Sequence, residues 1–308
     1  MRSASRILLL ALLGIVLVPA HSQAQVFTWT REQMVKYTAQ SPYERFPDGR
    51  PKVPDAMLEK VKGLSAEEVL AIAARGYPSQ FVDGLQVLRP GKKLVGRAVT
   101  LQLMPIRADV ADAQAAEWKA KGGARLSHQT VIDMLGPGDV LVVDVGGNIE
   151  AGGIVGDNLA YYIMKTTGAG FVIDGAIRDL EGIAAFDMAG YFRGATPPAI
   201  RNVMVTGINV PVRVGNTTVL PGDVVLGDRE GVYFIPPHLV QDIVDAADIT
   251  HIHDEWTRLK FDEGKYKSGE IYGRPSDPAL IQEYEDYLKK KLGVERYDAY
   301  VKRRSAVR

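Results

Sequence analysis

The sequence of 308 residues contains no cysteine. This absence excludes disulfide bonds, a thiolate nucleophile, a zinc site built on thiolates and an iron–sulfur cluster. The fold must therefore depend on a hydrophobic core, and a chain of this length is long enough to bury one.

The chain also lacks an excess of charge of either sign, since it has 37 basic and 37 acidic residues. A protein that binds the phosphates of nucleic acids needs a concentration of Lys and Arg on one surface. The sequence shows no such concentration, so we expect no nucleic-acid partner. A small anionic substrate would have to be held by a few local groups.

Histidine is scarce, with five in the chain. His251 and His253 are two residues apart and do not share one face of a helix, so a zinc site there is disfavoured. His128 and His238 are isolated and are interpreted as structural. Lys165 could form a Schiff base with a ketone, but nothing near it in the sequence indicates an activated amine.

Only one long apolar run is present, and it lies at the beginning of the chain. Arg2 and Arg6 precede this run at residues 7–18, Pro19 follows it, and small residues at 22 and 24 suit a signal peptidase. This order is typical of a secretory signal peptide, which we predict to be residues 1–24. An uncleaved anchor is the alternative, but the run is shorter than the ~20 apolar residues that span a bilayer. We expect an exported protein with no stable membrane insertion after cleavage, periplasmic if the source is a Gram-negative bacterium.

Three further segments follow the predicted signal peptide. Residues 25–63 are polar and interrupted by prolines, which predicts an N-terminal arm that wraps over another surface, with disorder as the alternative. Residues 64–262 alternate between strand and helix patterns, which predicts an α/β catalytic domain. Residues 263–308 begin with turn residues and contain a charged helix predicted at 278–292, so we expect a C-terminal helical extension.

Within the α/β segment, short apolar runs at 140–145 and 171–173 predict buried strands. A helix is predicted at 158–166, and Gly168 is well placed to end it. The pattern S-x-x-E at 65–68 is a capping box, which predicts the start of another helix. We also expect strands at 93–104, 203–206, 210–214, 224–225 and 232–235, and helices at 127–134 and 237–260.

The residues that could carry chemistry lie between the two buried strands and just after the second. Gly153 and Asp157 belong to a loop that leads into the predicted helix, whose N-terminus offers unpaired N–H groups to an anion. Arg178 and Asp179 directly follow the second strand, where ligands gather in open α/β sheets. Arginine binds carboxylate or ketone oxygens, and aspartate binds hard divalent cations. The plainer alternatives are that Asp157 only caps the helix, and that Arg178 and Asp179 form a surface salt bridge or Asp179 is a turn residue.

This spacing, G-x-x-x-D followed by twenty residues and R-D, resembles that of a known family. The chain is similar to the 4-hydroxy-4-methyl-2-oxoglutarate aldolases, which are class II pyruvate aldolases. The same family holds the RraA-type regulators of ribonuclease E activity. The strings GPGDVLVVD at 136–144 and IDGAIRD at 173–179 agree with the resemblance, which covers about residues 64–262.

The resemblance implies an α/β fold like the swivelling phosphohistidine domain, with layered sheets and flanking helices. It also implies a homotrimer or a stacked homohexamer, with active sites between the subunits. The implied cofactor is Mg²⁺ or Mn²⁺, and the implied substrate is a small 2-oxo acid.

The resemblance further implies a role for each site residue. Asp179 would bind the metal, Arg178 would hold the oxygens of the pyruvyl group, and Asp157 would orient a water that moves protons. The backbone N–H groups of Asn158 and Leu159 would receive the substrate carboxylate.

Two more positions complete this implied site. Gly153 would border the substrate, because a residue without a side chain lets the backbone approach a ligand. An acidic residue on the late helix of the neighbouring subunit would reach into the site. Glu255 is the best match for it, and Asp254 is the alternative.

We therefore expect a metal-dependent lyase that cleaves 4-hydroxy-2-oxo acids to pyruvate and a carbonyl product. Oxaloacetate decarboxylation is a second candidate reaction of the same site. The main alternative is a non-catalytic regulatory or ligand-binding protein of the RraA type. A methyltransferase is disfavoured, because no glycine-rich nucleotide loop is followed by an acidic ribose contact.

Overall fold

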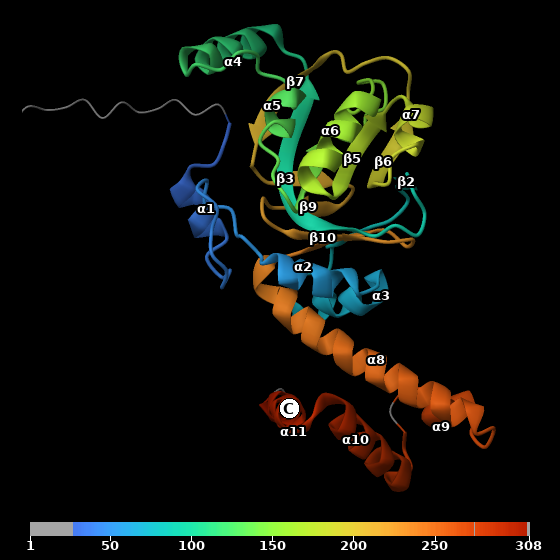
Figure 1. The fold of residues 1–308 in the computed structure, drawn as a ribbon. Coiled ribbons are helices and arrows are strands. Elements are labelled where there is room, and N and C mark those ends of the chain that lie inside the picture. The colour runs from blue at the N-terminus through green and yellow to red at the C-terminus, as the bar shows by residue number, and fades with distance from the viewer. Residues whose placement is uncertain (1–26, 274, 307–308) are drawn as a thin grey trace, which may run out of the picture.

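The computed structural model describes residues 27–273 and 275–306 (Figure 1). The predicted signal peptide at 1–24 lies outside the described residues. Within the described ranges, no helix combines the length and the apolar character that a bilayer-spanning segment requires.

A mixed β-sheet forms the centre of the fold. The strands are β1 (Phe81–Val82), β2 (Gln86–Val87), β3 (Leu94–Pro105), β4 (Asp139–Asp144), β5 (Gly170–Ile177), β6 (Ala189–Ala195), β7 (Val203–Ile208), β8 (Val212–Val214), β9 (Thr217–Val219), β10 (Val224–Gly227) and β11 (Val232–Ile235). Their order in the main sheet is β1-β11-β10-β3-β4-β5-β6-β2, with β7 paired to β3, while β8 and β9 form a separate hairpin. The four strands from β3 to β6 are parallel, and the remaining pairs are antiparallel.

Helices lie on both sides of this sheet. They are α1 (Arg31–Tyr37), α2 (Asp55–Lys62), α3 (Ala66–Val69), α4 (Ala108–Ala120), α5 (His128–Ile132), α6 (Asp157–Thr167), α7 (Leu180–Ala184), α8 (Val240–Asp262), α9 (Ser268–Ile271), α10 (Pro278–Leu292) and α11 (Val294–Ala306), with 3₁₀ turns at Leu70–Arg75 and Pro237–Leu239. Figure 1 shows α5, α6 and α7 beside the parallel strands, and α2, α3 and α8 below β10. The expected α/β fold with flanking helices is confirmed.

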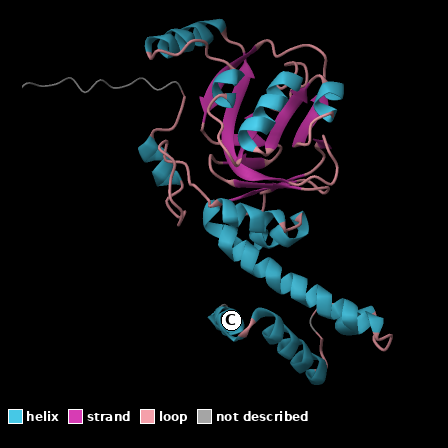
Figure 2. Ribbon diagram, in the orientation of Figure 1, coloured by secondary structure: helices cyan, strands magenta, loops and turns pink. Residues whose placement is uncertain are grey.

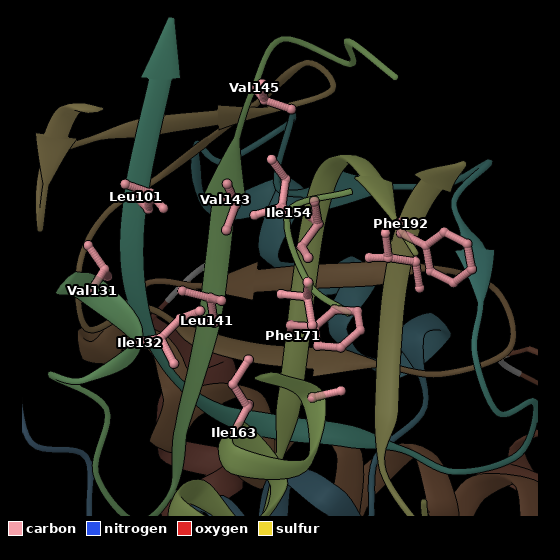
Figure 3. Packing of buried hydrophobic residues seen from close by; sticks show 14 of the residues in the cluster. Leu101, Val131, Ile132, Leu141, Val143, Val145, Ile154, Ile163, Phe171 and Phe192 are labelled. Atoms are coloured by element: carbon pink, nitrogen blue, oxygen red, sulfur yellow. The ribbon is translucent and has the colours of Figure 1, made fainter. Parts of the chain in front are cut away.

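The strand β4 is buried on both faces, which explains its unbroken apolar sequence. Leu141 and Val143 pack with Phe171 of β5 and Ile163 of α6 in one core cluster (Figure 3). The alternate residues Val140 and Val142 belong to a second cluster, which includes the β8–β9 hairpin. A strand of this kind has no polar face, so its sequence carries no period of two.

Several predicted elements are confirmed. The predicted strands at 140–145 and 171–173 correspond to β4 and β5, and the helix predicted at 158–166 corresponds to α6. Gly168 ends α6 in the left-handed conformation, with φ of 68°. The capping box of Ser65 and Glu68 is present, although α3 spans only four residues and continues as a 3₁₀ turn.

The segment expected to be an arm is partly built into the core. Met57, Leu58 and Val61 of α2 pack with residues of β11 and α8 in one buried cluster. Earlier residues are also attached to the body, because Ile208 N–H donates to Phe27 O at 3.2 Å and Arg50 is buried. The sequence did not predict this helix, because the prolines around it suggested irregular structure.

Five further helices were not predicted from the sequence: α1, α4, α7, α9 and α11. The described residues of α4 bury a single side chain, Gln114, so the helix has no apolar stripe to read. At the other end of the chain, Trp256 of α8 packs with Ile271 and Leu280, so that α9 and α10 fold back along the second half of α8 (Figure 2).

Candidate active site

Arg178 and Asp179 lie at the carboxyl end of β5, between that strand and α7. A loop runs beside this end of the strand, because Ile154 N–H donates to Ala176 O at 2.9 Å and Arg178 N–H donates to Val155 O at 3.0 Å. These two hydrogen bonds hold the glycine-rich loop and the Arg178 backbone together. The ends of β4 and β5 and the start of α6 thus meet at one edge of the sheet.

The N-terminus of α6 opens at this edge. Gly156 is the cap residue and Asp157 is the first helical residue, so the alternative in which Asp157 caps the helix is wrong. Asp157 Oδ1 instead accepts a hydrogen bond from Asn158 N–H at 2.7 Å. A substrate carboxylate would have to displace this bond to reach the Asn158 N–H group, whereas the neighbouring Leu159 N–H group donates no hydrogen bond to Asp157 in the described part of the chain.

Two glycines let the Arg178 and Asp179 side chains approach the helix. A Cβ atom at Gly153 would lie 2.7 Å from Arg178 Cβ, which is closer than real contacts allow. A Cβ atom at Gly156 would overlap Asp179 Oδ2 and lie 3.0 Å from Arg178 Nε. The guanidinium, the carboxylate and the start of α6 are therefore in direct contact, and the absence of side chains at 153 and 156 permits it.

Asp179 adopts an uncommon backbone conformation, with φ of 59° and ψ of 43°. This left-handed region costs a non-glycine residue about 1 kcal/mol or more. Asp179 is the residue before α7, but its side chain makes no capping hydrogen bond. Its Oδ2 lies 3.4 Å from Arg178 Nε, and the two side chains are 35% and 39% exposed. The strained backbone thus presents a solvent-accessible carboxylate beside a guanidinium.

A cation at this site would have few protein ligands. Among the described residues, no group of three or more His, Cys, Asp or Glu side chains is arranged to hold a metal ion. Asp179 offers hard oxygen atoms, and Mg²⁺ commonly binds one or two carboxylates while water and substrate fill its other positions. The donor set therefore fits Mg²⁺ or Mn²⁺ better than a zinc ion, which needs three or four protein ligands.

Two other buried carboxylates near the site serve the fold. Asp144 and Asp174 are paired in register near the ends of β4 and β5. Asp144 accepts a hydrogen bond from Arg213 N–H at 3.0 Å, and Asp174 accepts one from Gly215 N–H at 2.9 Å. Asp174 also pairs with Arg193 Nε at 2.5 Å. These bonds hold the β8–β9 hairpin against the sheet.

The structure does not bring Glu255 or Asp254 to this edge within one chain. Both residues lie on α8, on the other side of the sheet from α6 and α7 (Figure 1). Glu255 pairs with Lys291 at 2.7 Å, and hydrogen bonds from Lys291 and Tyr287 lower the pKa of its carboxyl group. Asp254 lies 3.7 Å from His253. A role for either acid in a neighbouring subunit stays a prediction.

Two further contacts of the site were not predicted from the sequence. Gly182 of α7 lies so close to Asp157 that a Cβ atom on it would be 2.9 Å from Asp157 Cβ. Gly153 N–H donates to Pro198 O at 2.8 Å, which fixes the other side of the loop. No local sequence signal predicted the second contact, because Pro198 is far from Gly153 in the chain.

Comparison with known proteins bears on this arrangement. A family model described as RraA-like, Aldolase/RraA, matches residues 65–234. A Halalkalibacterium halodurans protein provisionally named a 4-hydroxy-4-methyl-2-oxoglutarate aldolase is 38% identical over 120 residues, which cover 39% of this chain and 56% of that protein. The 4-hydroxy-4-methyl-2-oxoglutarate aldolase of Thermus thermophilus is 33% identical over 106 residues, which cover 34% of this chain and 64% of that protein. The chain thus spans less than two thirds of the length of both relatives.

A similar solved structure is that of Streptomyces coelicolor RraAS2, described as an unusual member of the RNase ES inhibitor RraA protein family. It is 29% identical, with a TM-score of 0.59, over 68% of this chain and 100% of that chain.

Proposed function

The chain belongs to the RraA-like family of aldolases and RraA proteins, and on that basis we propose that it is a divalent-metal-dependent carbon–carbon lyase. Its substrates would be 4-hydroxy-2-oxo acids, which it would cleave to pyruvate and a carbonyl product. The observation that carries this proposal is the direct contact of Arg178, Asp179 and the N-terminus of α6.

The chemistry requires stabilisation of negative charge. Breaking a carbon–carbon bond next to a ketone leaves an electron pair that moves onto the ketone oxygen as an enolate. The Arg178 guanidinium can donate two hydrogen bonds to the oxygens of the pyruvyl group. The N–H groups at the start of α6 can hold the carboxylate of the same group.

The reaction also requires proton transfer. Aldol cleavage removes a proton from the C4 hydroxyl group, and the enolate later takes up a proton at carbon to give pyruvate. Asp157 stands at the start of α6 and would hold the water that carries these protons. Loss of carbon dioxide from oxaloacetate leaves the same enolate, so decarboxylation would use the same groups.

Asp179 would hold the cation, with water and substrate as the other ligands. A bound divalent cation supplies positive charge that stabilises a developing enolate oxygen. We expect pyruvate release to stop when EDTA removes the metal and to return with Mg²⁺ or Mn²⁺, as measured by a lactate-dehydrogenase-coupled assay. The substrates are 4-hydroxy-4-methyl-2-oxoglutarate and oxaloacetate.

The metal prediction has a second readout. Mn²⁺ binding, followed by electron paramagnetic resonance, should be lost in Asp179→Ala and retained in Asp133→Ala, which changes an exposed aspartate of another loop. Activity that persists in EDTA, or full Mn²⁺ binding by Asp179→Ala, would contradict the assignment.

The glycine at the start of α6 offers a test of geometry. We expect Gly156→Ala to lower kcat/KM by about 10²-fold, because the added methyl group must displace Asp179 and Arg178, and small displacements of reacting groups carry penalties of this size. Steady-state kinetics and circular dichroism measure the two effects. The control is Gly269→Ala in α9, where an added Cβ meets nothing within 4 Å; equal losses in both variants would refute the geometric argument.

The assembly and compartment are part of the proposal. A homotrimer, or a hexamer of two trimers, would let an acid such as Glu255 approach the Arg178 site of a neighbouring subunit. Light scattering after size-exclusion chromatography measures the subunit number, and a monomer would remove this role of Glu255. Export to the periplasm is tested by fractionation of cells that express the full chain.

The likeness to RraAS2 supports a second candidate, a regulatory protein of the RraA type without turnover. The structural match to this chain covers the whole length of RraAS2. The sequence matches to the two named aldolases cover only part of the length of those proteins. Metal-dependent pyruvate release separates the two candidates, since a purely regulatory protein would release none.

A further inference from the structure

A cavity of about 470 Å³ lies away from the Arg178 site. Asp223 lines this cavity and directly precedes β10. The first residue of β10, Val224, is in register with Arg97 of β3. Arg97 is in turn in register with Asp139 at the start of β4. Arg178 follows the opposite end of the neighbouring parallel strand, β5. The cavity therefore lies at the other end of the parallel strands, and its volume is typical of pockets for small molecules.

The walls of the cavity come from four segments of the chain. They are the end of α1 with the loop that follows it, at 36–41, the segment 76–80, the hairpin region around 216–220 and the segment 236–238. The segments 36–41 and 236–238 lie outside residues 65–234, the range matched by the family model. The segment 36–41 is held in place, because Arg45 donates hydrogen bonds to Thr38 Oγ1 at 2.7 Å and to Thr38 O at 2.8 Å.

The carboxyl group of Asp223 is unusual when it is compared with that of Asp139, which ends a turn of the same sequence pattern. The chain contains two X-P-G-D turns, one ending at Asp139 and the other at Asp223. In each turn the aspartate Oδ2 accepts a hydrogen bond from the backbone N–H three residues earlier, at 2.9 Å from Gly136 and at 2.8 Å from Leu220. The turn therefore accounts for one carboxylate oxygen in both cases.

The second oxygen differs between the two turns. Asp139 Oδ1 lies 3.3 Å from Arg50 Nη1 and 3.9 Å from Arg97 Nε. Asp223 has no such cation, and no described residue forms a hydrogen bond with its Oδ1. Asp223 is nevertheless 97% buried, since its exposed fraction is 3%, and burial raises the pKa of its carboxyl group to about 7. Because Asp223 lines the cavity, its Oδ1 can accept a hydrogen bond from a donor group of a molecule bound there.

The rest of the lining is polar and nearly without net charge. Gln40, Ser79, Asn216 and Thr218 are exposed at the cavity, and no described residue forms a hydrogen bond with their side chains. Amide and hydroxyl groups both donate and accept hydrogen bonds, as do the hydroxyl groups of a polyol. Tyr77 adds an aromatic wall and is linked to His238 Nε2 at 3.2 Å.

The charges of the lining exclude a strongly ionic ligand. Lys36 and Asp223 oppose each other in sign, and burial lowers the pKa of His238, which favours its neutral form. We propose that this cavity is a second binding site for a neutral, hydroxyl-rich ligand of the size of a monosaccharide or disaccharide. Asp223 would accept a hydrogen bond from a ligand hydroxyl, and the rim amides and hydroxyls would bind its neighbours. This site is independent of the proposed lyase site.

Saturation-transfer difference NMR on the full chain tests the proposal. The neutral probes are D-glucose, D-xylose and maltose, and the charged probes are D-glucosamine and D-glucuronate. We expect a saturable signal from at least one neutral probe and weaker binding of both charged probes. Asp223→Asn should raise the Kd about tenfold, because its amide oxygen keeps the Leu220 N–H bond and the turn, while the group that faces the ligand changes from an oxygen acceptor to an N–H donor.

A second variant and two controls make the test decisive. Thr218→Trp places a large side chain at an exposed position of the cavity mouth and should abolish the signal without altering the core. Asp133→Asn, an exposed aspartate elsewhere, and Arg178→Ala should bind the probe as the unmodified chain does. The proposal is overturned by no saturable signal from any neutral probe, by unchanged binding in both cavity variants, or by tighter binding of a charged probe than of glucose.

Discussion

Arg178→Ala should lower kcat for pyruvate release by about 10²–10³-fold, the size of effect seen when one donor to a developing oxyanion is removed. The guanidinium of Arg178 is the positively charged group that touches both Asp179 and the start of α6. Its loss removes stabilisation that the substrate needs mainly in the transition state, so kcat should fall more than KM rises. A coupled assay at several substrate concentrations separates the two constants.

The fold should tolerate this change. The side chain of Arg178 is 39% exposed, and its structural hydrogen bond, to Val155 O, uses the backbone N–H group that alanine keeps. Arg178→Lys should recover little of the rate, because lysine retains the charge but not the two-pronged geometry. Arg107→Ala, which changes an exposed arginine of another loop, is the matched control. Full turnover by Arg178→Ala would remove the lyase proposal.

The largest expected effect on stability lies elsewhere, at Asp139→Ala. Asp139 is 2% exposed and lies beside the buried guanidinium groups of Arg50 and Arg97. Truncation leaves these charges without their shared anion, although Asp48 and Asp55 still contact them. Breaking a buried ion pair in this way typically costs 3–5 kcal/mol, and the remaining partners place the expected loss near the lower end, at about 3 kcal/mol.

Urea denaturation followed by circular dichroism measures this loss. Asp133→Ala is the control, because Asp133 is exposed and forms no ion pair within the described chain; its midpoint should stay close to that of the unmodified protein. The N-terminal segment should also become more open to proteolysis in Asp139→Ala, since Arg50 ties that segment to the sheet. An unchanged midpoint in Asp139→Ala would show that the cluster adds no net stability.

The same ion cluster explains why the role of the N-terminal segment escaped the sequence analysis. Its prolines and polar residues are typical of an irregular arm, and a local pattern contains nothing more. The structure instead buries Arg50 against Asp139, from a distant part of the chain, and stacks Arg50 over Phe46 at 4.7 Å. A pairing between residues so far apart depends on how the sheet brings them together, and no spacing rule predicts it.

By contrast, the sequence by itself determined the elements that build the candidate site. The strands β4 and β5, the helix α6 and the position of Arg178 and Asp179 could be predicted because each depends on neighbours in the chain: apolar runs, glycines and a helix end. The tertiary structure alone decided which carboxylates pair with a guanidinium group and which face a cavity. Asp139 and Asp223 end the same four-residue turn, yet one meets two guanidinium groups and the other meets a cavity. The turn is set by local backbone geometry, whereas the partner of the free oxygen is set by whatever distant segment the fold packs against it.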